Sequence, residues 1–292
     1  MTERAPSGAL LLDKPPDITS ARAVSRIKGL LPRGTRVGHT GTLDPLASGL
    51  LVLLIGRATR LSRYVTHLEK TYTATARFGA VSDTLDADGE ISQIDAPMPD
   101  ERTLSAALPD FTGKLLQTPP MASAIKVGGR RLYTLHRRGL TVEREPRLVT
   151  IHSLTLTAFD PKQQSATFEV SCSSGTYVRA LISDLATSLD TGAYLTALRR
   201  TKVGHLSVEN ASSPEDLSPA TPFNHMVQMS QAVAHLPGLA VDAEGERLVA
   251  SGRVLRANGM KGSLRVEREG ELLAVYRGDG EVARAEVVLC GG

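Results

Sequence analysis

Apolar residues occur along this chain in short runs separated by glycine, proline and charged positions. The most uniform run is Leu50–Ile55, which lies between Gly49 and Gly56. A run of this length is typical of a buried strand, although periodicity alone leaves a buried helix open. We favour a strand that lies inside the core.

Three other segments have the spacing of amphipathic helices: Ser20–Leu31, Thr103–Leu108 and Val178–Leu189. In the last of these, apolar side chains recur every three or four residues, as on the buried face of a helix. They are Val178, Leu181, Ile182, Leu185 and Leu189. We expect an α+β body, with a mixed, largely antiparallel sheet flanked by helices.

The pattern changes near residue 212. The turn-rich stretch Ser212–Pro222 predicts a linker or a surface segment. A modestly amphipathic stretch, Met226–His235, follows, and Glu244–Arg253 is interpreted as a short helix that ends around Gly252. The tail then has short apolar runs set off by glycines, the pattern of a small β-barrel. These runs are Leu264–Val266, Leu272–Tyr276 and Ala285–Leu289.

The charge of the 292-residue chain is only mildly basic, at +3 with a pI near 8.9. Between residues 124 and 147, however, seven basic residues face two acidic ones, a local charge of +5. Gly128 and Gly129 interrupt this stretch, so we expect an extended, partly mobile insertion. A solvated basic loop is the ordinary interpretation of such a run. The basic residues are Lys126, Arg130, Arg131, Arg137, Arg138, Arg144 and Arg147.

Cysteine use and hydropathy favour a cytoplasmic protein. Cys172 and Cys290 are the only cysteines and lack metal-type spacing, which predicts two free thiols in a reducing compartment. No His lies beside Cys172 in the sequence, so a packing role is favoured over a nucleophile. The longest apolar run is too short to span a bilayer, and residues 1–16 lack a signal-peptide stretch.

The candidate chemistry lies in the loop Gly38–Gly49, which holds a single carboxylate, Asp44, among small residues. An Asp before a Pro is often only a turn former. A phosphate loop is rejected, since no Gly-Lys-Ser/Thr follows and the acid would repel phosphate. A metal site with His39 lacks convergent partners. Local chemistry leaves a cap, a base and a nucleophile open for Asp44.

The stretch from residue 38 to residue 60, GHTGTLDPLASGLLVLLIGRATR, resembles the signature of the TruB family of tRNA pseudouridine synthases. In that family the Asp of the G-T-L-D segment is the catalytic nucleophile. The resemblance therefore assigns this role to Asp44. It also implies that His39 occupies the space that a flipped nucleotide vacates.

Further segments between residues 9 and 205 resemble motifs of the same family, in the same order. Asp17 stands in place of a usual Gly, Ser82 in place of a Thr, and Ala122 where many members carry Tyr. The segments are Leu11–Ser20 (D-K-P-x-G-x-T-S), Lys70–Tyr72 (K-x-Y), Phe78–Gly89 (G-x-x-T-D-T-x-D-x-x-G), Thr118–Tyr133 (P-P-x-x-S-A-x-K-x-x-G-x-R-x-Y), Cys172–Leu181 (C-x-x-G-T-Y-I-R) and Leu198–Thr201 (L-R-R-T).

The resemblance implies roles for four more residues. Tyr72 would stack on the target base and act in proton transfer, and Tyr177 would line the pocket. Arg179 would pair with the aspartate, since a guanidinium both orients a carboxylate and favours its charged form. Leu198 would complete the apolar side. An ordinary core position is the alternative for Tyr72, Tyr177 and Leu198. No metal and no cofactor are expected, because the isomerisation oxidises nothing and releases no group.

The function implied is isomerisation of uridine 55 in the T-loop of tRNA, with base flipping and an aspartate nucleophile. The partner would be the T-arm of tRNA, with no membrane and no obligate protein partner implied. The basic insertion matches a thumb that guide-dependent enzymes lack, which favours a synthase without a guide RNA. The alternative is a non-catalytic tRNA-binding or tRNA-folding chaperone on the same scaffold.

The resemblance also implies a domain organisation. A pseudouridine synthase catalytic domain would span residues 1–233, with the thumb-like insertion at about 118–150. Residues 234–292 resemble, in position and pattern, the PUA-type RNA-binding domain that ends many members.

The insertion gives a first testable prediction. Replacing its arginines with glutamine is expected to weaken tRNA binding and to flatten its salt dependence. With fewer phosphates contacted, binding releases fewer counterions. The measurement is the tRNA dissociation constant over a series of salt concentrations. An unchanged slope would show that the insertion does not contact phosphates.

Overall fold

The computed structural model describes residues 6–290 apart from 124, 128, 137 and 219–223. Contacts divide the chain into two compact units. The first comprises residues 1–44, 49–68 and 203–292, and the second comprises residues 45–48 and 69–202. The expected division into a catalytic domain, residues 1–233, and a PUA-like domain, residues 234–292, stays a prediction.

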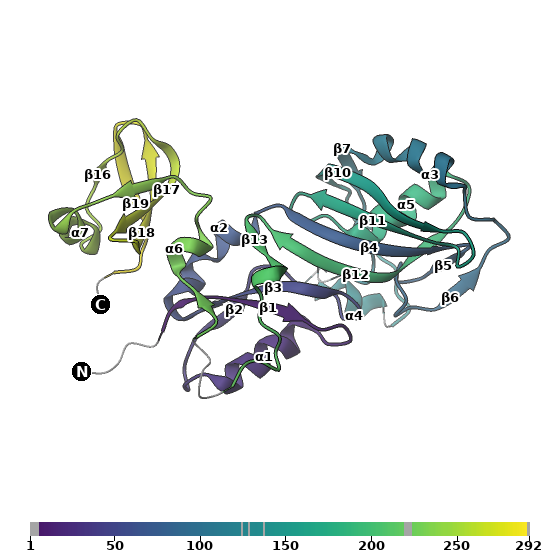
Figure 1. Ribbon diagram of the computed structural model, residues 1–292, viewed down its shortest axis with the longest axis horizontal. Helices are drawn as coiled ribbons and strands as arrows, with labels where there is room; N and C mark the ends of the chain where they lie inside the picture. The colour runs from purple at the N-terminus through teal and green to yellow at the C-terminus, as the bar shows by residue number, and fades with distance from the viewer. Residues whose placement is uncertain (1–5, 124, 128, 137, 219–223, 291–292) are drawn as a thin grey trace. The chain divides into compact units, whose positions relative to one another are not determined.

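The first unit contains the strand formed by the uniform apolar run. β3 (Ser48–Ile55) is buried from Gly49 onward, so a strand, and not a helix, is confirmed. It pairs antiparallel with β1 (Gly8–Lys14) and with β2 (Val37–His39) (Figure 1). β1 pairs in turn with β14 (Met226–Val227).

Helix α1 (Ser20–Leu30) confirms the first predicted helix. Thr19 caps it by accepting a hydrogen bond from the Arg22 N–H. Before the cap, Asp17 has a φ of 64°, a conformation that Gly adopts freely and Asp tolerates better than most residues. The buried Lys14 Nζ donates to the carbonyls of Pro15 and Ile18, on either side of this residue. The substitution of Asp17 for Gly therefore keeps the turn.

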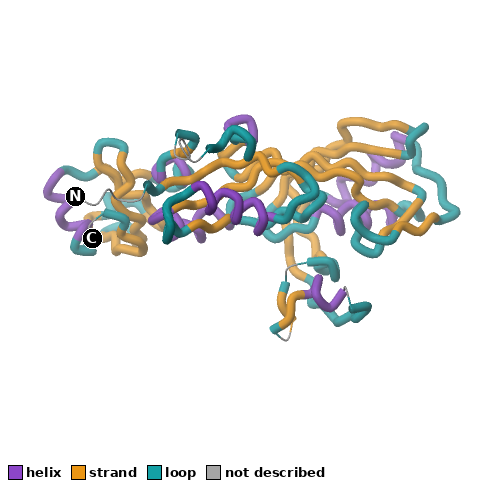
Figure 2. The backbone as a smooth tube through the Cα atoms, turned by 90° about the horizontal axis from the view of Figure 1, so that it is seen from below, coloured by secondary structure: helices purple, strands orange, loops and turns teal. Residues whose placement is uncertain are grey.

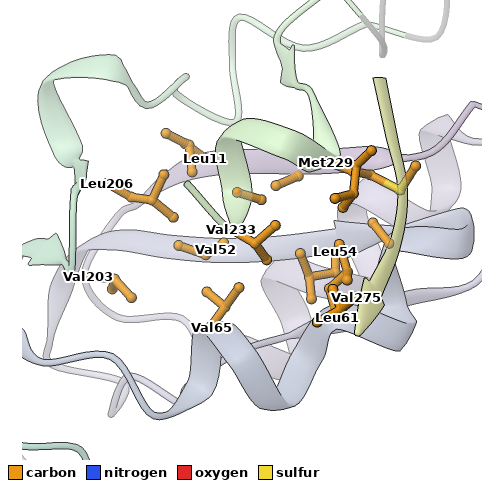
Figure 3. Close-up of a cluster of buried hydrophobic side chains, with 14 of the residues drawn as sticks. Leu11, Val52, Leu54, Leu61, Val65, Val203, Leu206, Met229, Val233 and Val275 are labelled. Carbon is orange, nitrogen blue, oxygen red and sulfur yellow. The ribbon is translucent and has the colours of Figure 1, made fainter. Parts of the chain in front are cut away.

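The core of the first unit joins distant parts of the chain (Figure 3). Side chains of β3 pack against η1 (Gly56–Leu61), α2 (Ser62–Thr66) and residues of the C-terminal tail. Burying these apolar surfaces favours folding by roughly 25 cal/mol per Å². The labelled members are Leu11, Val52, Leu54, Leu61, Val65, Val203, Leu206, Met229, Val233 and Val275.

The tail forms a five-stranded sheet, and each predicted apolar run overlaps one of its strands. Only β15 pairs in parallel with its neighbour, and the other pairs are antiparallel. In order across the sheet the strands are β15 (Gly238–Ala240), β17 (Lys261–Arg268), β18 (Glu271–Asp279), β19 (Val282–Val288) and β16 (Leu255–Arg256).

Two predicted segments of the tail differ in detail from the structure. The helix expected to end at Gly252 is α7 (Ala243–Ala250), followed by Gly252 in the left-handed region at φ 67°. The amphipathic stretch becomes β14 and then the single-turn helix α6 (Met229–Ala232), because Gln228 and Gln231 form a capping box between them. The last four residues of the expected linker, 219–222, lie outside the described residues.

The second unit is built on a sheet with helix α5 (Val178–Ser188) behind the strands in the view of Figure 1. Three strand pairs of this sheet are antiparallel, which confirms the expected type of sheet. A hairpin of β5 (Ala80–Ser82) and β6 (Ile91–Gln93) adjoins it. The sheet strands, in order, are β12 (Ala193–Val203), β4 (Lys70–Phe78), β11 (Ser165–Cys172), β10 (Arg147–Asp160) and β7 (Gly113–Gln117).

Both predicted helices of this unit are confirmed. On α5, the predicted apolar face is buried except for the half-buried Leu189, which follows the last turn. Helix α3 (Glu101–Ala107) begins two residues earlier than expected, because Asp100 caps it through the Thr103 N–H. The 3₁₀ turn η2 (Leu108–Phe111) continues it.

The basic insertion contains secondary structure, so it is not extended throughout, whereas its expected mobility stays a prediction. Strands β8 (Lys126–Val127) and β9 (Arg130–Arg131) form a hairpin, and helix α4 (Leu132–His136) follows. Met121, Leu132 and Leu135 form a small apolar cluster of their own. Figure 2 shows this segment extending away from the strands of the second unit. Ala124, Gly128 and Arg137 lie outside the described residues.

Two expectations concern cysteine and membranes. Cys172 and Cys290 are both free, as predicted, and Cys172 is buried. Within the described ranges, no helix combines the length and apolarity needed to cross a membrane.

A polar cluster ties the tail to α2 within the first unit. Glu286 on β19 accepts hydrogen bonds from the Tyr64 hydroxyl at 2.8 Å, Ser263 Oγ at 3.0 Å and Arg277 Nε at 2.9 Å. Arg63 Nη2 lies 3.2 Å from the same carboxylate. Burial alone would raise the pKa of Glu286, but these donors hold the pKa below its ordinary value.

We expect Glu286→Gln to lower the free energy of unfolding at neutral pH by about 1–3 kcal/mol, because charge-assisted hydrogen bonds are lost. A carboxyl whose pKa is depressed in the folded state stabilises the fold above its unfolded pKa, near 4.5. That stabilising contribution disappears as the pH falls through the lower pKa that Glu286 has in the folded state. The difference between variant and wild type should therefore shrink in acid. Urea denaturation at neutral and acidic pH measures it, with the exposed Glu271→Gln as control; a difference that persists in acid would contradict this account.

Candidate active site

The candidate nucleophile, Asp44, lies half-buried in the loop that connects β2 to β3. The Thr40 N–H donates to the Val52 carbonyl at 3.1 Å, which fastens the start of the loop to β3. His39, also half-buried, accepts the Gly41 N–H at Nδ1 over 3.4 Å. The loop therefore presents a carboxylate and an imidazole from one short segment.

Ser20 holds the backbone next to Asp44. Its buried Oγ accepts the Leu43 N–H at 2.8 Å and donates to the Leu43 carbonyl at 2.9 Å. Both polar backbone groups of the residue before Asp44 are thus fixed by one side chain. Sequence reasoning assigned no role to Ser20, and the signal available was its place at the end of the D-K-P-x-G-x-T-S segment.

In the second unit, Arg179 lies in the first turn of α5 and is only 4% exposed. Its Nη1 lies 2.9 Å from Asp86 Oδ2 and donates to the Thr84 carbonyl at 2.7 Å. Its Nη2 donates to the Ala122 carbonyl at 2.8 Å. The resemblance pairs Arg179 with Asp44, and that pairing stays a prediction. The structure adds a second carboxylate, Asp86, which sequence reasoning missed although its motif was recognised.

Asp86 is itself surrounded by donors. Thr84 Oγ1 donates to Asp86 Oδ1 at 2.6 Å, and the Asp88 N–H does so at 3.2 Å. Ser82 Oγ donates to the Asp86 carbonyl at 2.6 Å, so Ser can replace the family's Thr at this position. A buried ion pair is favourable only when such bonds compensate for lost hydration. Leu85, between these residues, has a φ of 65°, a strained conformation held by its neighbours.

Tyr177 is the residue that precedes α5, as expected. The buried Gln117 amide holds its backbone: Oε1 accepts the Tyr177 N–H at 2.7 Å, and Nε2 donates to the Tyr177 carbonyl at 3.0 Å. The side chain of Tyr177 is half-buried. Gln117 is a second positioning residue that the motifs did not indicate.

Tyr72 lies on β4 opposite Val170 and is half-buried. Lys70, two residues earlier, lies on the same face of the strand and is buried. Burial, with a smaller effect of Arg200, lowers the pKa of Lys70 to about 8. Leu198 on β12 is 7% exposed, which agrees with a core position; its contact with substrate stays a prediction.

The predicted site residues thus come from both units. Asp44 and His39 belong to the first unit, and the second holds Tyr72, Tyr177, Leu198 and Arg179.

Cys172 lies in the core and is poorly placed to act as a nucleophile. It is 1% exposed, and burial raises the pKa of its thiol to about 11, so almost no thiolate exists at neutral pH. This burial agrees with the predicted packing role. Across the residues that the structure describes, no three His, Cys, Asp or Glu side chains gather into a group that could hold a metal ion.

The family model described as TruB family pseudouridylate synthase (N terminal domain) matches residues 28–178. The chain belongs to the TruB family. A protein of Burkholderia mallei named tRNA pseudouridine synthase B is 41% identical, with all of both chains covered. One of the same name from Aquifex aeolicus is 40% identical over 86% of this chain and 88% of its own length.

Solved structures confirm the fold. The chain is similar to one in the crystal structure of a Cbf5-Nop10-Gar1 complex, with a TM-score of 0.73 and 23% identity over 97% of this chain and 85% of that chain. The same values hold for a structure of an H/ACA RNP bound to a substrate RNA containing 2′-deoxyuridine. The expected α+β pseudouridine synthase fold is therefore correct.

The ion pair between Arg179 and Asp86 yields a prediction about stability. Asp86→Asn should lower the free energy of unfolding by about 3–5 kcal/mol, because it leaves the buried guanidinium without its carboxylate. Urea denaturation measures the loss, and the exposed Asp95→Asn is the control. Equal stability of both variants would show that the pair contributes nothing.

Proposed function

We propose that this protein converts uridine 55 in the T-loop of tRNA to pseudouridine, without a guide RNA and with Asp44 as nucleophile. The observation that carries the proposal is the full-length similarity, 41% identical, to a relative named tRNA pseudouridine synthase B. The signature loop around Asp44 supports the assignment of the nucleophile.

The reaction balances within the substrate. The bond between the ribose C1′ and uracil N1 breaks, the base rotates, and C1′ bonds to C5. C5 gives up a proton and N1 takes one, so no oxidant or co-reactant is needed. A single carboxylate can act as the nucleophile through a transient covalent adduct.

Asp44 must be ionised to react. Desolvation in a closed site raises the pKa of a carboxylate, and a nearby cation opposes that effect. In the proposed site Arg179 supplies this cation. The contacts of Arg179 with Asp86, Thr84 and Ala122 support this role, because a guanidinium held on several sides keeps a fixed orientation.

The target base has to leave the folded loop before it can react. Tyr72 is proposed as the platform on which the flipped base stacks, an interaction of about 1–3 kcal/mol, and as the group that transfers a proton. Tyr177 and Leu198 would line the pocket, and His39 would fill the space left in the RNA. The clamp of Gln117 on the Tyr177 backbone supports a fixed wall at this position.

The substrate is proposed to be held at its T-arm by the basic insertion at about 118–150. The hairpin and helix of that insertion have their own apolar cluster, which supports a structured binding element. The C-terminal sheet is proposed as a PUA-like RNA-binding domain, and the cytoplasm as the compartment.

The decisive experiment incubates wild type and Asp44→Asn with unmodified tRNA transcript and maps pseudouridine chemically. Wild type should modify the T-loop uridine, and the variant should give none above background, because an amide cannot act as the nucleophile. Asp110→Asn, an exposed site, is the matched control. Tight binding without modification by wild type would favour the chaperone, and modification elsewhere would overturn the assigned target.

A further inference from the structure

Residues 18–43 contain five basic side chains and no Asp or Glu. The whole chain, by contrast, has 34 Lys and Arg against 31 Asp and Glu. All five basic residues are exposed, on α1 and on the turn that follows it. They are Arg22, Arg26, Lys28, Arg33 and Arg36, called here the basic helix surface.

This surface is joined at both ends to the loop that carries Asp44. At one end, Ser20 begins α1 and bonds both backbone groups of Leu43. With a rise of 1.5 Å per residue, Arg22 and Arg26 lie only about 3 and 9 Å along the helix axis from Ser20. At the other end, Arg36 directly precedes β2, whose last residue is His39.

The arrangement of charge within α1 is unfavourable without a partner. Arg22 lies in the first turn, where the helix dipole favours anions, and that turn has no acidic residue. Arg22 and Arg26 are four residues apart on one face, so they repel one another. Arg26 forms an ion pair with Glu215 at 3.2 Å, but both side chains are more than half exposed, so the pair is weak. A bound external anion would reduce both the unfavourable interaction of Arg22 with the helix dipole and the repulsion between Arg22 and Arg26.

Arg33 extends the surface beyond the helix. It lies in a turn closed by the Thr35 N–H on the Pro32 carbonyl at 3.1 Å, with Gly34 at a φ of 85°. The turn is narrow and the Arg33 side chain is exposed. Planar guanidinium groups that project from ordered backbone suit phosphate oxygens.

We propose that the basic helix surface binds the sugar–phosphate backbone of the RNA that flanks the target uridine, in addition to the insertion at 118–150. The proposal rests on the proposed function, since it takes the RNA to be the substrate of the Asp44 site. Phosphate contacts carry no sequence information, so this surface contributes affinity and register.

The test compares a triple variant, Arg22→Gln with Arg26→Gln and Arg33→Gln, with wild type for binding to tRNA transcript. Loss of three phosphate contacts should reduce the salt slope by about two and weaken binding about tenfold or more at low salt. The matched control removes three exposed cations of the second unit, Arg77, Arg102 and Lys162, each replaced by Gln. The control should bind like wild type.

Two results would overturn the proposal: an unchanged dissociation constant and slope in the triple variant, or an equal loss in the control. Thermal melting of each variant checks the fold, which should survive because the altered side chains are exposed. Pseudouridine formation by wild type is measured on the same tRNA. Its absence would overturn the proposed function, whereas the surface is judged by binding and salt slope alone.

Discussion

The buried pair of Arg179 and Asp86 is the interaction on which the second unit's part of the site depends. One guanidinium connects the start of α5, the turn at residues 82–89 and the carbonyl of Ala122 at the base of the insertion. Both side chains are only 4% exposed, so each charge needs hydrogen-bonding partners to remain buried. The position of Tyr177, two residues before Arg179, and the base of the insertion are therefore fixed together.

Two buried neutral side chains also hold distant segments in place, by hydrogen bonds to the backbone. Ser20 bonds the N–H and the carbonyl of Leu43, and Gln117 does the same for Tyr177. Each clamp comes from a buried residue distant in sequence and acts at or beside a proposed functional residue. A loop of small residues has few side-chain contacts of its own, so hydrogen bonds from outside must define its conformation.

Sequence patterns predicted those elements and positions that periodicity and the order of motifs determine. The buried strand β3, helices α1 and α5, and the place of Arg179 beside Tyr177 all follow from local spacing. Asp86 and Ser20 were inside recognised motifs, yet their roles were missed because the partners lie 93 and 23 residues away. Gln117 acts only on backbone atoms, which any residue possesses, so no pattern of residue types reveals it. The hairpin and helix of the insertion were missed because their apolar cluster is only a few residues in size.

The last residues of the signature stretch, residues 38–60, make different contacts from the first. Asp44 is the proposed nucleophile, but Arg57 and Arg60 donate to the carbonyls of Leu289 and Val288 in the tail. Leu272 and Val275 of the tail join the core around β3. The strand that follows the proposed catalytic loop thus contributes, with the segment after it, to the packing of the C-terminal sheet. The structure accounts for the later part of the family signature by packing, because these residues hold the C-terminal sheet whether or not Asp44 is the nucleophile.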